Sequence, residues 1–188
     1  MPCLLIIHGE IGSGKTTTAT ALAERARMRG IHISGILSRR VFEANRLVGY
    51  DLQDTDSGRL FPLVRLRGTV AGEGWDALGN PLYAFSLAGF REANRLLSEA
   101  AKRLDALTLL ILDEYGGVES QGLGLRRGAE AVLGSLYRGG AAVFLCRAER
   151  VDEIVALASG KVDCILCLEA GDSEAAWRII ARCLGLKP

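Results

Sequence analysis

The sequence has little that would direct the chain to a membrane or to a polyanion. No apolar stretch reaches the roughly 20 residues that a membrane-spanning helix needs, and no basic segment precedes the apolar residues 1–7 as it would in a signal peptide. The 23 basic and 22 acidic residues leave a net charge of only +1, so electrostatics do not favour nucleic acid as a partner. We therefore expect a cytoplasmic protein with neither a membrane nor a nucleic-acid partner.

The five cysteines lack the pattern of a disulfide-rich secreted domain, because they lie within apolar segments of a 188-residue chain. Cys164 and Cys167 have the CxxC spacing of redox and zinc motifs. They fall in residues 162–168, which the apolar pattern predicts as a buried strand, and residues three apart on a strand point to opposite faces. We expect two buried structural cysteines there. His8 and His32, in or beside predicted strands, are expected to be structural as well.

Apolar segments of strand length alternate with segments of helical periodicity along most of the chain. This alternation is typical of an α/β fold, with a mostly parallel sheet covered by helices on both faces. Strands are expected at residues 4–8, 31–38, 107–112, 141–146 and 162–168. Helices are expected after residue 16, from Ser86 as a helix cap, at 127–138, at 151–158 and around 177–180.

The segment 41–84 breaks this alternation. Residues 47–52 and 59–66 alternate loosely between apolar and polar, which predicts a small antiparallel ribbon at the edge of the sheet. Gly68–Pro81 is rich in glycine and predicts a long loop, which is either a functional lid or an inert insertion.

Gly9–Thr16 matches the P-loop pattern G-x-x-x-x-G-K-[ST], between a predicted strand and an amphipathic helix. Its glycines allow backbone N–H groups to turn inward around phosphate oxygens, and the helix N-terminus adds a partial positive charge. Lys15 supplies a cation to the β- and γ-phosphates, and Thr16 supplies a hydroxyl to Mg²⁺. We predict that ATP or GTP contacts the loop through Gly9, Glu10, Ile11, Gly12, Ser13, Gly14, Lys15, Thr16 and Thr17.

The P-loop and the alternating pattern together predict a P-loop NTPase fold. We expect one nucleotide-binding domain over residues 1–188, with the ribbon and long loop of residues 41–84 as an insertion.

Two carboxylates, Asp113 and Glu114, follow the apolar residues 109–112. Asp113 is expected at the end of a buried strand beside the strand that leads into the P-loop, where it would hold Mg²⁺ through the ion's water shell. Glu114 is expected to point the other way and to act as the general base for a water molecule that attacks the γ-phosphate. The sequence thus predicts Thr16 and Asp113 as metal ligands and Lys15 and Glu114 as catalytic residues.

Phosphoryl transfer usually needs a further cation at the γ-phosphate. In sheets of this type ligands lie at the carboxyl ends of strands, which favours Arg39 and Arg147, and we take Arg147 as the catalytic candidate. Arginines in a first helical turn oppose the helix dipole, so we expect an anionic partner for them, such as Glu119. The two arginines at such a helix start, also candidates, are Arg126 and Arg127.

The chain resembles the THEP1-type nucleoside-triphosphatases, over most of its first 120 residues. Beyond the P-loop, the resemblance rests on Gly35–Arg40 followed by Arg46–Leu52, on Phe90 with Ala93, and on Asp113–Glu119. The last stretch, DEYGGVE, is similar to the family's Asp-Glu-Ile-Gly-Lys-x-Glu signature, with Gly117 in place of the lysine. The resemblance implies Mg²⁺-dependent hydrolysis of nucleoside triphosphates, with little base selectivity and slow turnover.

Two alternative functions remain open at the level of sequence. In a small-molecule kinase, residues 41–84 would form the acceptor site; in a nucleotide-binding adapter for metallocofactor assembly, turnover would be minimal. No Asn-Lys-x-Asp segment is present to specify guanine, which argues against a signalling-type GTPase. Tyr50 and Tyr83 are candidates for stacking on the base or for packing.

Overall fold

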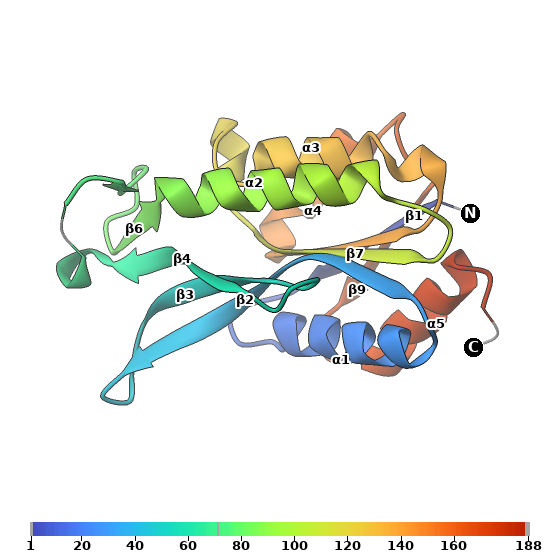
Figure 1. Cartoon of the computed structure of the whole chain (residues 1–188), viewed down its shortest axis with the longest axis horizontal. Coiled ribbons are helices and arrows are strands. Elements are labelled where there is room, and N and C mark those ends of the chain that lie inside the picture. Colours follow the sequence, from blue (N-terminus) through green and yellow to red (C-terminus); the bar gives the residue numbers. More distant parts are fainter. Residues whose placement is uncertain (1, 71, 187–188) are drawn as a thin grey trace.

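The computed structural model describes residues 2–70 and 72–186. One sheet of nine strands runs through the molecule, with α2, α3 and α4 on one face and α1 and α5 on the other (Figure 1). The helices are α1 (Lys15–Met28), α2 (Leu87–Lys102), α3 (Arg126–Leu133), α4 (Val151–Ala158) and α5 (Ser173–Cys183). The strands are β1 (Cys3–His8), β2 (His32–Glu43), β3 (Arg46–Asp54), β4 (Leu60–Leu66), β5 (Trp75–Asp76), β6 (Tyr83–Ser86), β7 (Thr108–Tyr115), β8 (Ala141–Cys146) and β9 (Cys164–Glu169).

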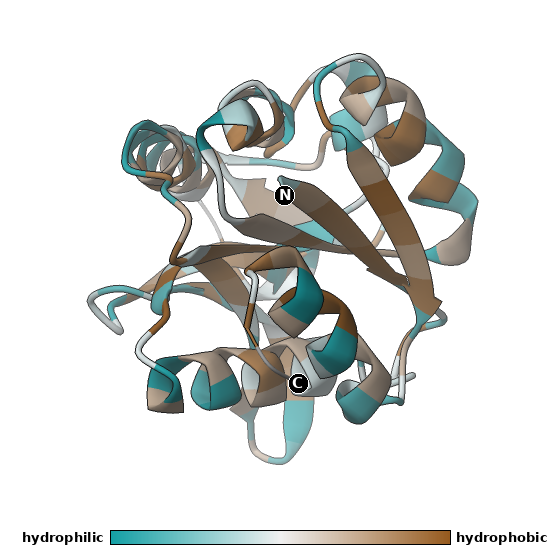
Figure 2. Ribbon diagram, turned by 90° about the vertical axis from the view of Figure 1, so that its right-hand side faces the viewer, coloured by the Kyte–Doolittle hydropathy of each residue, from teal (hydrophilic) through white to brown (hydrophobic). Residues whose placement is uncertain are grey.

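Five strands, in the order β2-β7-β8-β1-β9, pair in parallel and form what we call the parallel half of the sheet. Every residue of β8 and all but the last of β1 are buried, because helices cover both faces. Such strands are apolar along their whole length rather than alternating. Figure 2 shows these strands in brown between helices with teal, hydrophilic outer faces. The predicted α/β fold with a mostly parallel sheet is confirmed.

The neighbour of the P-loop strand was predicted wrongly. We expected the strand that carries Asp113, β7, beside β1, but β8 lies between them. The strands β7 and β8 are both buried and apolar, so their composition cannot tell which of them is adjacent to β1.

The second half of β2 continues the sheet in an antiparallel manner. It pairs with β3 from Ile36 to Glu43, and β4, β6 and β5 follow in antiparallel order. We call β3 to β6 the antiparallel half. The predicted ribbon is confirmed but larger than expected, since Gly68–Pro81 contributes β5, and a 3-10 turn covers Arg67–Thr69. Residue 71 of this segment lies outside the described residues.

The CxxC segment was also predicted wrongly as buried. The strand that carries it, β9, is at the edge of the sheet and pairs only with β1. Cys164 is therefore half-buried and Cys167 is exposed. An apolar run alone does not distinguish a buried central strand from a partly exposed edge strand.

The helix α2 begins as the sequence predicts. The Ser86 hydroxyl accepts a hydrogen bond from the Gly89 N–H at 3.0 Å and caps the helix. Among the described residues, none of the helices has both the length and the apolar character needed to cross a membrane.

Candidate active site

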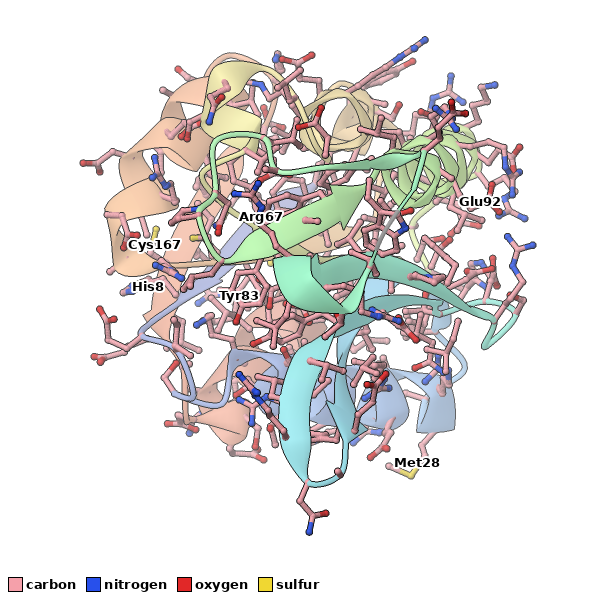
Figure 3. All side chains as sticks on the ribbon, turned by 90° about the vertical axis from the view of Figure 1, so that its left-hand side faces the viewer. His8, Met28, Arg67, Tyr83, Glu92 and Cys167 are labelled. Atoms are coloured by element: carbon pink, nitrogen blue, oxygen red, sulfur yellow. The ribbon has the colours of Figure 1, made fainter. Side chains whose placement is uncertain are left out.

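The predicted site residues converge where the parallel strands end. Figure 3 looks onto this end of the molecule, with His8 of β1 and Cys167 of β9 on one side and Tyr83 of β6 nearer the middle. The P-loop leaves β1 here and enters α1, and Asp113 and Glu114 lie at the end of β7. Segments almost 100 residues apart in the chain thus share one edge of the sheet.

The P-loop forms a tight backbone turn before α1. Gly14, the residue that precedes the helix, has φ of +91°, a conformation that favours glycine. At Gly9 a Cβ would lie 2.6 Å from the Ser13 hydroxyl, so a larger residue does not fit there. The Lys15 ammonium folds over the loop and donates hydrogen bonds to the carbonyls of Gly9 at 2.7 Å and Glu10 at 2.8 Å. The predicted loop residues therefore form one concave turn with a cation across it.

Asp113 connects the P-loop helix to the sheet. Its Oδ2 accepts hydrogen bonds from the Thr16 hydroxyl at 2.9 Å and from the Ser38 backbone N–H at 3.0 Å. The side chain is buried, and this desolvation raises its pKa, against the lowering effect of the two hydrogen bonds. The two residues predicted to hold Mg²⁺, Thr16 and Asp113, are in direct contact.

Glu114 is placed by an irregularity in β7. The register between β7 and β8 shifts after Leu112, and Glu114 has φ of +73°, which is unusual for a residue with a side chain. The bulge leaves Asp113 buried and Glu114 exposed. The protein around the Glu114 carboxyl group keeps water away from it, and this desolvation is the main cause that raises its pKa to about 7. The negative charge of Asp113 is the next cause, and the positive charge of Lys15 opposes the increase. A carboxyl group with a pKa near neutrality is suited to accept a proton.

Ser38 is a site residue that the sequence analysis did not single out. Its N–H holds Asp113, and its hydroxyl is buried without a hydrogen-bond partner in the described part of the chain. A buried hydroxyl without a partner is uncommon and marks a place where a polar group of a ligand fits. The available signal was its position, since Ser38 and Asp113 both follow closely after the last parallel pair of β2 and β7, Ile36 with Leu112.

The four candidate arginines lie in different surroundings. Arg147 directly follows β8, is exposed, and its positive charge lowers the pKa of Glu114, so it faces the site. The Arg39 side chain donates from Nε to the Gln53 side chain at 2.7 Å and is held on β3. Arg127 lines a groove between α2 and α3. Arg147 therefore remains the candidate whose charge acts on Glu114.

The expected pairing of Glu119 with an arginine is wrong. Arg126 binds Glu130 at 2.8 Å and Glu153 at 3.1 Å. The buried Glu119 carboxylate instead accepts backbone N–H bonds from Gly116 at 2.8 Å and Leu125 at 2.7 Å. Backbone donors satisfy a buried carboxylate without the ordering of a long side chain, and here they fix the loop after Glu114.

The antiparallel half also reaches the site. Burial, and next the negative charge of Glu114, raise the pKa of Tyr50 on β3, and Tyr83 on β6 adds to the shift. Tyr50 thus lies near Glu114, and Tyr83 lies near Tyr50. By contrast, His32 lies at the start of β2, with Nε2 3.5 Å from Asp56, at the opposite end of that strand's parallel part.

These residues fit a nucleotide phosphate and a divalent cation. The Lys15 ammonium, the concave glycine turn and the orphaned hydroxyls of Ser13 and Ser38 are complementary to an anion rich in acceptor oxygens. The Thr16 hydroxyl and Asp113 carboxylate are the oxygen ligands that Mg²⁺ prefers.

Comparison with known proteins identifies the family of the chain. A family model described as NTPase matches residues 4–166, which include the P-loop, Asp113, Glu114 and Arg147. The chain belongs to the NTPase family. The resemblance noted from its motifs is confirmed.

Two curated proteins that are similar to this chain are named nucleoside-triphosphatase THEP1. That of Pyrococcus abyssi is 28% identical over 114 residues, covering 60% of this chain and 58% of the relative. That of Thermococcus kodakarensis is 26% identical over 120 residues, covering 63% of each. The chain spans about three fifths of the length of the curated relatives that it matches.

Solved structures share the fold over nearly the whole chain. A human cancer-related nucleoside triphosphatase superposes with a TM-score of 0.66 at 21% identity, over 97% of this chain and 96% of that one. THEP1 from Aquifex aeolicus gives a TM-score of 0.68 at 17% identity, over 95% and 98%.

Proposed function

We propose that this protein hydrolyses nucleoside triphosphates to diphosphate and phosphate in a Mg²⁺-dependent reaction. The observation that supports it most is the 2.9 Å hydrogen bond between Thr16 and Asp113, which joins the P-loop helix to the strand that carries Glu114. Family membership adds that two curated relatives of the chain are named nucleoside-triphosphatase THEP1.

The chain's own residues divide the work. The N–H groups of Gly9–Thr17 and the Lys15 ammonium bind the β- and γ-phosphates. When it binds them, Lys15 gives up its hydrogen bonds to the carbonyls of Gly9 and Glu10. Glu114 accepts a proton from water as that water attacks the γ-phosphorus in line with the leaving diphosphate. Arg147, at the same edge, counters the charge that accumulates on the transferred group.

Thr16 and Asp113 would hold the divalent cation. When bound, Mg²⁺ supplies positive charge to the β- and γ-phosphate oxygens and removes the need for Asp113 to bind a proton. The raised pKa of Asp113 in the protein without metal agrees with a carboxylate that is built for a cation partner.

We further propose broad base tolerance and slow turnover by one domain over residues 1–188. The contacts above all involve phosphates, and Tyr50 and Tyr83 offer aromatic faces that accept any base by stacking. P-loop proteins without a strong cationic contribution from their own chain hydrolyse nucleotide at about 10⁻⁴–10⁻² s⁻¹. Arg147 is exposed and only weakly paired, with Glu149 at 3.9 Å, so its position is not firmly fixed and we expect slow turnover.

The test is phosphate release from ATP, GTP, CTP and UTP, with and without Mg²⁺, in wild type and two variants. Lys15→Ala should lose nucleotide affinity in calorimetry, by about tenfold or more. Glu114→Gln should retain nucleotide but release phosphate about 10²–10⁴-fold more slowly. The exposed residues Lys161 and Glu24 provide matched controls, Lys161→Ala and Glu24→Gln, which should behave as wild type.

Three results would contradict the proposal. Phosphate release that is unchanged in Glu114→Gln removes this residue from the mechanism. Nucleotide consumption that requires an added acceptor indicates a small-molecule kinase. Tight binding of Mg²⁺·ATP without any hydrolysis indicates a nucleotide-binding adapter.

A further inference from the structure

A groove outside the nucleotide site lies between α2 and residues 123–127. It has a volume of about 570 Å³ and is open to solvent on the face of the sheet that α2, α3 and α4 cover. One wall is the outer side of α2, and the other is the end of the loop that leads into α3. In Figure 1 these two helices lie side by side above the sheet.

Hydrogen bonds between a side chain of α2 and the backbone of the other wall fix the two walls of the groove relative to each other. The Asn94 side chain on α2 donates to the Gly124 carbonyl at 2.8 Å and accepts from the Gly128 N–H at 2.6 Å. At Gly128 a Cβ would lie 2.5 Å from Leu97, so glycine allows α3 to approach α2 closely. The two walls therefore have one relative position before any ligand arrives, which reduces the entropic cost of binding.

The charge of the groove differs from that of the whole chain. Four cations line it and only one carboxylate, Glu99, whereas the chain as a whole is almost neutral. Glu99 is already paired with Arg95 at 2.7 Å. Among the described residues, the other three cations have no carboxylate within ion-pair distance; they are Arg91, Lys102 and Arg127.

One end of the groove is apolar. Leu87 and Leu123, which line it, are 36% and 47% exposed, and Leu78 and Phe90 lie beside them. Exposed leucines at the end of a cationic groove favour a ligand that carries both apolar side chains and negative charge.

We propose that this groove binds a short, acidic segment of a partner protein. The apolar side chains of this segment contact the leucines at the apolar end of the groove. Its carboxylates pair with Arg91, Lys102 and Arg127. On a helix that rises 1.5 Å per residue, Arg91 and Lys102 are about 16 Å apart, the length of about five residues of extended peptide. The segment is therefore short and carries carboxylates along its length.

Nucleic acid fits these features less well. A phosphate backbone has no apolar group to contact the two exposed leucines. Base stacking needs an exposed aromatic ring, and Phe90, the aromatic residue of the lining, is only 8% exposed.

The test is fluorescence anisotropy of the full chain with a set of labelled eight-residue peptides that combine Glu or Asp with Leu or Phe. The same peptides with Gln and Asn in place of the acids, and a single-stranded DNA of eight nucleotides, are the comparison probes. We expect the acidic set to bind more tightly than both, with an affinity that falls as salt is added.

Charge reversal of the groove supplies the decisive variant. Arg91→Glu with Lys102→Glu should weaken binding of the acidic peptides by about tenfold or more. The matched control is Arg178→Glu with Arg182→Glu, the same change at two exposed positions of α5, and it should bind as wild type. The circular dichroism spectrum and urea midpoint of the first variant should equal those of wild type, which shows that it is folded.

Three outcomes would overturn the proposal. These are failure of the entire acidic set to bind wild type, equal losses in the two double variants, and tighter binding of the DNA than of the peptides. Because neither variant touches the P-loop or β7, the result is independent of the hydrolysis proposed above.

Discussion

The parallel and antiparallel halves of the sheet differ in burial, and therefore in which residue types each position can accept. In the parallel half, β1 and β8 are almost wholly buried and helices cover both faces. In the antiparallel half, burial is partial, and the large apolar side chain of Leu60 in β4 is 53% exposed. The phosphate loop and both acidic residues belong to the parallel half, whereas the antiparallel half adds Tyr50 and Tyr83 at the margin of the site.

In the function proposed above, phosphate chemistry would take place on the rigid half and base recognition on the more adaptable one. A catalytic arrangement must hold its groups within fractions of an ångström, which packed parallel strands allow. An antiparallel ribbon with a partly exposed surface tolerates changes in loop length and side chain at lower cost.

The largest expected effect compares one glycine from each half. A Cβ at Gly35 in β2 would lie 2.0 Å from the Ile111 carbonyl oxygen, and one at Gly49 in β3 would lie 2.0 Å from that of Val64. Gly35 also has φ of +110° and lies between packed strands. We expect Gly35→Ala to cost more than about 4 kcal/mol and to prevent folding, and Gly49→Ala to cost about 1–3 kcal/mol.

Urea denaturation followed by circular dichroism measures the free energy of unfolding of Gly49→Ala and shows whether Gly35→Ala has any unfolding transition. Equal losses in the two variants would mean that the halves are equally rigid, and the comparison would then fail.

A second, smaller effect compares two buried carboxylates. Glu119 accepts two backbone N–H bonds in the loop after β7, and Asp54 accepts from the Asp56 N–H at 3.1 Å and the Ser57 hydroxyl at 2.6 Å in the turn after β3. Both alanine variants should lose about 1–3 kcal/mol of unfolding free energy, because donors are left unpaired. Only Glu119→Ala should also slow phosphate release, since its loop holds Glu114.

The measurements are urea denaturation and phosphate release at saturating Mg²⁺·ATP. If Asp54→Ala slows release as much as Glu119→Ala does, after correction for the unfolded fraction, then loss of stability rather than loop geometry explains the effect.

The sequence predicted the parts of the site that obey strict local rules. A glycine turn around an anion, a lysine and a threonine at fixed spacing, and acids after a buried strand are each required by the chemistry, so the P-loop and Asp113 could be read from the residues. Ser86 as a helix cap is predictable for the same reason.

What could not be predicted depends on contacts between distant segments. The position of β8 between β7 and β1 follows from the path of the chain, and the exposure of Cys167 follows from an edge position. The bulge at Glu114 and the contact of Ser38 with Asp113 arise only when β2, β7 and β8 pair. Local patterns contain no information on such pairings.

The smallest predicted effect concerns the pH dependence of stability without Mg²⁺. Three carboxyl groups with a raised pKa, Asp113, Glu114 and Glu119, all lie in β7 or the loop that follows it. Between pH 4.5 and about 7 the folded protein retains the proton of Glu114, whereas the unfolded chain has released it. The folded state thus binds more protons in this range, so its free energy of unfolding decreases as the pH rises.

Glu114→Gln removes one of these groups, so its stability should depend less steeply on pH between 4.5 and 7. Because the residue is exposed, screening should limit the difference to less than about 1 kcal/mol. Urea denaturation at pH 5, 6, 7 and 8 in the presence of a chelator measures it. Parallel curves for wild type and variant would show that Glu114 does not titrate differently in the two states. The pH dependence of stability would then have to come from Asp113 and Glu119.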